Sequence, residues 1–204
     1  MAKLKKTKNE LKAQREALRR YHRFLPTLEL KKQQLQREVR RAEAALREGV
    51  AREEALLEQL RPWVKLLSAP LDLDAYVRVT ALDLESANIA GVTVPVLTRV
   101  RFVRPEIDYF VTPVWLEDAI AALTELTSIR AGQRVLERRK ELLGEELRIT
   151  AQRVNLFEKV MIPRSEENMR IIRIALGDAQ TAAVARAKLA KGKGAQLLSG
   201  MAGA

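Results

Sequence analysis

The chain of 204 residues contains no cysteine and a single histidine, His22, which lies in a basic stretch. The absence of cysteine excludes disulfide bonds, thiolate metal sites and cysteine nucleophiles. A lone histidine in such a stretch is typical of a solvated side chain, and without a second one no transition-metal site is expected. Aromatic residues make up only 4% of the chain, so a globular core would lack its usual large side chains.

Long apolar runs and phosphate-binding loops are also missing. No segment approaches the ~20 apolar residues that a membrane-spanning helix needs, and no apolar core of a secretory signal follows the basic N-terminus. We therefore expect a soluble chain that reaches a membrane only through partners. No Gly-x-x-x-x-Gly-Lys-Ser/Thr loop occurs, and no spacing assembles a nucleophile with its base. The sequence thus predicts no catalytic residue, no cofactor and no metal.

Five residue types dominate what is present. Ala, Leu, Glu, Lys and Arg make up 115 of the 204 residues, a share that is typical of coiled coils and long helices. The net charge is +11, and residues 1–61 alone carry 17 basic and 9 acidic side chains. The flanking parts of the chain are helical in composition, whereas residues 62–112 are not.

A heptad pattern covers the first 61 residues. Leucines stand seven apart from Leu4 to Leu25, and a second column, offset from the first by three residues, is apolar from Tyr21 to Leu56. This 3–4 alternation predicts a helix with one apolar stripe and a left-handed supercoil. Pro26 falls inside the stripe without changing its phase, so we expect a kinked helix that ends near Pro62 and Trp63.

The middle of the chain changes its period. Alternating or β-branched segments at 76–80, 92–96 and 100–103 predict strands, and residues 86–91 are expected to form the loop of a hairpin. Two strands alone are marginal in water, so the hairpin must pack on the helices or on a partner. Trp63 and Trp115 flank this insert and are expected to pack in a small core of their own.

A second apolar ladder runs from Leu126 to Met161 and is interrupted at Gln133 and Lys140. It predicts another long helix over residues 113–190, with a kink at Pro163. We expect the two helices to pair because neither stripe can stay in water. The predicted fold is dominated by α-helix, with two long helices in an antiparallel left-handed coiled coil and a short β-hairpin insert. The predicted parts are a helix (1–61), an insert (62–112), a helix (113–190) and a flexible tail (191–204).

Four segments carry a likeness to a known family. The most specific is Arg153–Lys159, which reads Arg-Val-Asn-Leu-Phe-Glu-Lys and is followed by Ile-Pro at 162–163. The other three are Phe24–Lys32, Val92–Val96 and Thr112–Trp115. In this order they resemble the D subunit family of V-type (V/A-type) rotary ATPases, most closely its bacterial branch with the chlamydial form. The resemblance covers about residues 8–190.

The resemblance implies a central rotor stalk that transmits torque between a catalytic head and a membrane ring that moves ions. The chain would act in proton or other ion transport and in ATP synthesis, without catalysing a reaction itself. The implied partners are the A and B subunits of the head, the small F subunit of the stalk and a C/d subunit that forms a socket above the ring. The chain would lie on the cytoplasmic side of the membrane, peripheral to it, with no direct contact to nucleic acid.

Basic residues near the N-terminus allow three interpretations. They bind nucleic acid by releasing counterions, they attract an acidic bearing surface in the catalytic head, or they keep the helix in solution. No groove-reading motif or aromatic platform accompanies them, and the resemblance favours the bearing. The candidate interface residues are Lys5, Lys8, Lys12, Arg15 and Arg19.

A second group of candidate interface residues comes from the family motif: Arg153, Asn155, Glu158 and Pro163. Either these residues contact a partner or bridge the two helices near the proline, or they form a solvated face with local pairs. The competing hypothesis for the whole chain is a basic coiled-coil scaffold or nucleic-acid-binding arm. Residue patterns do not identify the transported ion or the direction of the ATP reaction.

Overall fold

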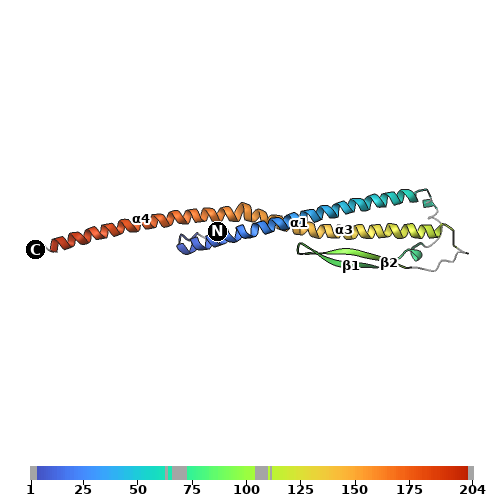
Figure 1. The fold of residues 1–204 in the computed structure, drawn as a ribbon, viewed down its shortest axis with the longest axis horizontal. Helices are drawn as coiled ribbons and strands as arrows, with labels where there is room; N and C mark the ends of the chain where they lie inside the picture. Colours follow the sequence, from blue (N-terminus) through green and yellow to red (C-terminus); the bar gives the residue numbers. More distant parts are fainter. Residues whose placement is uncertain (1–3, 63, 66–72, 104–109, 111, 202–204) are drawn as a thin grey trace. The chain divides into compact units, whose positions relative to one another are not determined.

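The computed structural model describes residues 4–62, 64–65, 73–103, 110 and 112–201, with the backbone alone at 74 and 192–201. The chain forms two compact units. The terminal unit combines Met1–Glu29 with Gln152–Ala204 and therefore holds both chain ends. The hairpin unit spans Leu30–Ala151. The predicted fold class is confirmed, because two long packed helices are separated in sequence by a two-stranded antiparallel hairpin (Figure 1).

The first helix, α1, runs without interruption from Lys8 to Leu60. Thr7 caps its start, because the Glu10 amide donates a hydrogen bond to the Thr7 hydroxyl at 3.3 Å. Pro26 lies inside the helix, as the unbroken heptad phase predicted. The helix ends just before Pro62, where a residue without a backbone N–H cannot continue it. Trp63 lies outside the described residues, so its predicted packing is untested.

The second long helical stretch consists of α3 (Leu116–Leu156), a π-helical turn η2 (Phe157–Met161) and α4 (Ile162–Met201). The sequence predicted a kink at Pro163, and the structure has the wide turn directly before it. Pro163 has no N–H to donate to the carbonyl four residues earlier, and its ring would crowd that carbonyl. In the wide turn the Ile162 amide donates to the Phe157 carbonyl instead.

Helix α4 extends past residue 190, where the sequence predicted the helix to end. Its backbone is helical through Met201. Alanine, leucine, lysine and glutamine favour helix strongly enough to outweigh the isolated glycines at 192, 194 and 200. The flexibility of residues 191–204 stays a prediction.

The insert contains a short helix, α2 (Leu73–Tyr76), and the strands β1 (Val79–Ile89) and β2 (Val92–Phe102). Two expected boundaries were wrong. Tyr76 belongs to α2 rather than to a strand, and residues 86–89 extend β1 rather than forming a loop. The signal for the longer strand was present in the alternating leucines at 82 and 84. The third strand segment, at 100–103, merges into β2.

Only Ala90 and Gly91 form the hairpin turn, since Ile89 pairs with Val92. Both turn residues have positive φ, 51° and 83°, as a two-residue type I′ turn requires. The side chain of Asn88 stabilises the turn by accepting a hydrogen bond from the Gly91 amide at 3.0 Å. Local chemistry at three residues therefore fixes the strand register next to the turn. Farther from the turn the register shifts between Asp83 and Leu84 and again between Val79 and Ala81.

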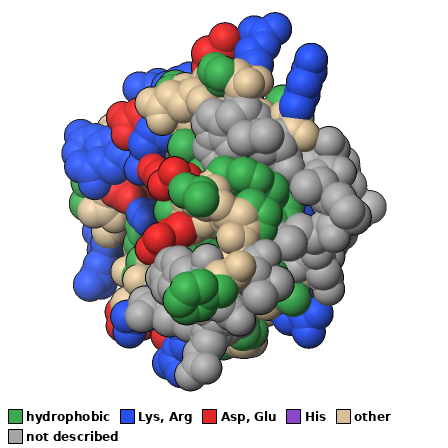
Figure 2. Space-filling model, turned by 90° about the vertical axis from the view of Figure 1, so that its right-hand side faces the viewer, with side chains coloured by type: hydrophobic (Ala, Val, Ile, Leu, Met, Phe, Trp, Pro, Cys, Tyr) green, Lys and Arg blue, Asp and Glu red, His purple; other side chains and the backbone are tan. Residues whose placement is uncertain are grey.

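The core of the hairpin unit contains two clusters. In the first, Leu35 of α1, Val94 of β2 and Leu143 of α3 are fully buried together. This cluster is where the hairpin joins the helix pair (Figure 1). In the second, Leu126 of α3 is buried with two leucines near the end of α1, Leu56 and Leu60. Figure 2 views the end at which α1 stops, and it shows hydrophobic side chains in the middle of that face.

Ion pairs flank the apolar seam between α1 and α3. Exposed pairs contribute only about 0–1 kcal/mol each, so the buried leucines dominate stability and the charges favour this register. The pair between Glu38 and Arg139 is the most shielded, with side chains 17% and 23% exposed. The carboxylate of Glu53 accepts a hydrogen bond from Arg130 at 2.8 Å, which holds the pKa of Glu53 below its ordinary value. The four pairs are Lys31–Glu146, Glu38–Arg139, Glu43–Lys140 and Glu53–Arg130.

The terminal unit has its own seam. The rings of Tyr21 on α1 and Phe157 in η2 lie 5.2 Å apart between centroids, a favourable aromatic separation. Val154, Met169 and Ile172 are buried in this unit. The apolar column of α1, which is fully buried at Leu35, is only half-buried from Leu11 to Leu28.

We predict that Leu143→Ala lowers the free energy of unfolding by about 2–5 kcal/mol, because it opens a cavity beside Leu35 and Val94. Leu30→Ala is the matched control, since Leu30 is also helical but 56% exposed, and it should change stability by less than about 1 kcal/mol. Chemical denaturation monitored by circular dichroism measures both. Equal losses for the two variants would contradict the assigned seam.

Two glycine-to-alanine substitutions should act in opposite directions. Gly91→Ala forces a side chain into positive φ and should destabilise the protein by about 1 kcal/mol. Gly144 lies within α3, and a Cβ atom added there would meet nothing within 4 Å, so Gly144→Ala should stabilise by about 0.5–1 kcal/mol. The shift of the denaturation midpoint gives the sign of the stability change for each variant. A change of the same sign for both variants would refute the turn assignment.

Candidate functional site

The described part of the chain holds no candidate metal site. Its histidine and carboxylates form no group able to hold a metal ion, and His22 is exposed. None of the described helices combines the length and the apolarity that crossing a bilayer requires.

All nine candidate interface residues belong to the terminal unit, and all nine are exposed. Lys8, Lys12, Arg15 and Arg19 follow one another at helical spacings of four, three and four residues. These spacings place the four cations on one face of α1, separate from the apolar column at Leu11 and Leu18. Lys5 precedes the helix.

The four cations of α1, which we call the basic stripe, are largely without acidic partners. Lys12 approaches Glu16 at 4.0 Å, with both side chains more than half exposed. Among the described residues, Lys8, Arg15 and Arg19 make no ion pair. Since charges on one exposed face add to a shared positive potential, the basic stripe can attract an acidic surface before contact is made.

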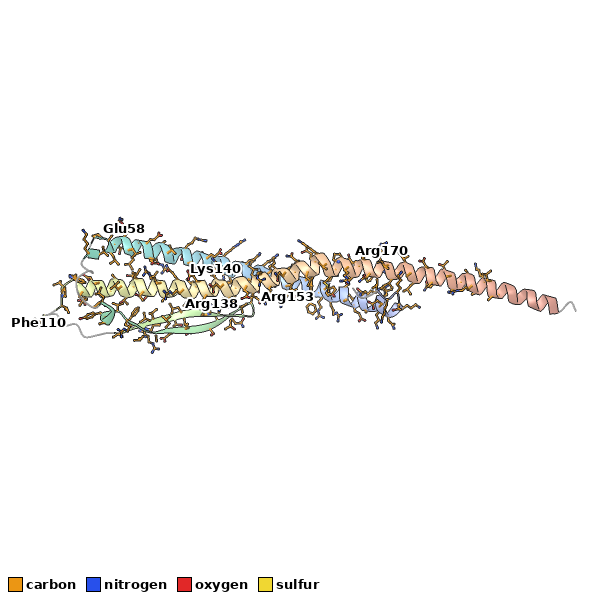
Figure 3. The ribbon with its side chains drawn as sticks, turned by 180° about the vertical axis from the view of Figure 1, so that it is seen from behind. Glu58, Phe110, Arg138, Lys140, Arg153 and Arg170 are labelled. Carbon is orange, nitrogen blue, oxygen red and sulfur yellow. The ribbon has the colours of Figure 1, made fainter. Side chains whose placement is uncertain are left out.

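The second candidate group surrounds the π-helical turn. Arg153 and Asn155 lie in the last turn of α3, Glu158 lies in η2, and Pro163 lies in α4. Figure 3 shows Arg153 just before the wide turn. Within the part of the chain that the structure describes, Arg153, Asn155 and Glu158 form no ion pair or side-chain hydrogen bond. They therefore do not bridge the two helices there, and they do not form local pairs.

Residue patterns missed two features near this turn. Leu156 and Val160 are 46% and 47% exposed, so apolar side chains stand among the polar candidates. Glu167 and Arg170 on α4 form a double hydrogen bond at 2.7 and 2.8 Å. Arg170 lowers the pKa of Glu167, and Glu167 raises that of Arg170. The i, i+3 spacing of this pair was a usable signal, whereas exposure of single leucines and valines depends on the fold.

Comparison with known proteins gives one consistent result. The family described as the D subunit of ATP synthase matches residues 10–192. The chain is 40% identical over 191 residues to the D subunit of the V-type ATP synthase of Borreliella burgdorferi, covering 94% of this chain and 95% of the relative. It is 37% identical over 193 residues to the protein of the same name from Chlamydia trachomatis serovar L2, covering 93% and 95%.

The likeness agrees with the architecture. Chlamydia muridarum has a further relative of the same name, 36% identical over 193 residues. The matched region includes the hairpin and all of both long helical stretches except the first two residues of α1 and the last nine of α4. The chain therefore belongs to the D subunit family of V-type ATP synthases, and it is a non-catalytic component of the central stalk in a complex that links ATP synthesis to ion transport.

Proposed function

We propose that the chain is the shaft that transmits torque between the catalytic head and the ion-translocating ring. The observation that supports this proposal is that two faces of α1 have different surroundings. The apolar face of the helix is buried at Leu35 and half-buried from Leu11 to Leu28, whereas another face presents the basic stripe, of which only Lys12 approaches an acidic side chain among the described residues. A buried seam resists twisting, and an exposed charged face is free to meet other subunits.

The specific contacts are part of the proposal. The end of the chain that bears the basic stripe contacts the A and B subunits of the head, the small F subunit binds the side of the stalk, and the C/d subunit forms the socket that joins the stalk to the ring. The chain then sits on the cytoplasmic side of the membrane and touches it only through partners. Long-range attraction suits a rotating contact, because it does not require apolar side chains to interlock at one angle.

The segment 153–163 is proposed as a second contact. Its polar side chains at 153, 155 and 158 have no partner among the described residues, and Leu156 and Val160 are exposed beside them. A π-helical turn is a frequent feature of functional sites. The uncommon turn and the exposed apolar side chains together support contact with another subunit at this position.

We predict that Lys8→Gln, Arg15→Gln and Arg19→Gln, combined in one variant, lower ATP-driven ion uptake by the complex reconstituted in vesicles. The loss arises because the head no longer attracts the basic stripe. ATP hydrolysis and subunit stoichiometry are measured on the same preparations. The matched control neutralises Arg37, Arg40 and Arg47, which are exposed cations on the same helix in the hairpin unit.

Ion uptake and subunit stoichiometry equal to those of the control variant would refute the role of the basic stripe.

The salt dependence of binding distinguishes the shaft from the competing hypothesis of a nucleic-acid-binding arm. Binding to nucleic acid would fall steeply as ionic strength rises, whereas the shaft should stay with its complex through moderate salt. Purification of the chain with nucleic acid and without ATPase subunits would favour that other function.

A further inference from the structure

The apolar ladder of the terminal unit predicts which residues of α4 should be buried. Val154 is 3% exposed, and the half-buried Phe157 and Met161 follow it at spacings of three and four residues. Side chains that recur at alternating spacings of three and four share one face of a helix. An uninterrupted α-helix would therefore bury Arg164 and Asn168 next. This arrangement would place a guanidinium group in the interior of the unit, which is costly unless the group is paired.

The residues that are buried in α4 lie one position later. Ser165, Met169 and Ile172, which we call the buried column, are 6%, 6% and 0% exposed. By contrast, Arg164 is exposed and Asn168 is half-buried. The buried column therefore continues the earlier ladder with a displacement of one residue. Since one residue of an α-helix corresponds to a rotation of about 100°, the interior face of α4 differs from the face that the earlier ladder would place there.

The π-helical turn η2 lies between the two phases and accounts for the displacement. In this turn the Ile162 amide donates to the carbonyl of Phe157, five residues earlier, instead of to the carbonyl four residues earlier. A turn of this kind holds one residue more than an α-helical turn. The extra residue brings Ser165 to the position that residue 164 would otherwise occupy. The insertion and the displacement of the buried column therefore have the same size.

The opposite face of α4 is turned toward solvent. The start of α1 belongs to the same unit and lies beside the start of α4 (Figure 1, Figure 3). The Glu167–Arg170 ion pair has side chains that are 51% and 65% exposed, and Arg170 points away from α1 (Figure 3). A rotation of α4 by one residue would turn this ion pair toward a different direction.

We propose that η2 sets the rotational position of α4 by taking up one residue that the seam does not need. The turn keeps Met169 and Ile172 buried, and it keeps the Glu167–Arg170 pair on the outer face. Which face of α4 the other subunits of the complex meet then depends on this turn. The inference goes beyond torque transmission, because it concerns how one chain packs and holds for a rotating shaft or a static one.

Thiol labelling of the full chain tests whether burial of the column, and not Pro163 alone, maintains the turn. The sequence contains no cysteine, so Arg164→Cys and Ser165→Cys each introduce one thiol. We expect the thiol at 164 to react with a maleimide at least about tenfold faster than the thiol at 165, because reactivity requires access. The same ratio is expected after Pro163→Ala is added to each variant. Equal or reversed rates in the Pro163→Ala background would overturn the proposal.

Single-residue deletions test the insertion itself. Deletion of Val160, which is 47% exposed within η2, should leave the melting temperature unchanged or higher, because the ladder then keeps one phase in a continuous α-helix. The matched control deletes Glu145, an exposed residue of α3, where no wide turn takes up the change. This deletion should lower the melting temperature by at least about 5 °C. Equal losses for the two deletions would overturn the proposal. Neither measurement involves ion transport, so failure here is distinguishable from failure of the shaft.

Discussion

The burial of leucine between α1 and α3 is the interaction on which the rest of the structure depends. Leu35 and Leu143 are fully shielded from water and hold Val94 of the hairpin between them. Each such side chain contributes roughly 1.5–3 kcal/mol by leaving water, which exceeds the contribution of any exposed ion pair beside it. The hairpin cannot be stable as two isolated strands, so its position depends on this seam.

Sequence periodicity predicted the helix pair and much of its core, because a buried stripe must recur every three or four residues. The buried positions Leu35, Ala42 and Leu143 all lie on the predicted ladders. Strand and turn boundaries that depend on local backbone conformation were harder to predict from the sequence. The two-residue turn at Ala90 and Gly91 requires positive φ at an alanine, and alanine gives no sequence signal for that conformation.

The candidate interface residues were likewise predictable from the sequence only in part. The spacing of the basic stripe was readable from the sequence, since helical geometry alone places Lys8, Lys12, Arg15 and Arg19 together. The displacement of the buried column in α4 was not predicted, because Ile171 and Ile172 are both apolar and the sequence alone does not show which of them is buried. The wide π-helical turn before Pro163 was likewise not predicted, although proline itself indicated an irregularity.

Rotation of the chain during ATP hydrolysis tests the central claim most directly. Because the sequence contains no cysteine, Thr93→Cys introduces one unique thiol on an exposed hairpin position to which a bead can be attached. With the head immobilised and ATP supplied, the account predicts continuous unidirectional rotation of the bead that stops when ATP is removed. A stationary bead on a complex that hydrolyses ATP at its full rate would contradict it.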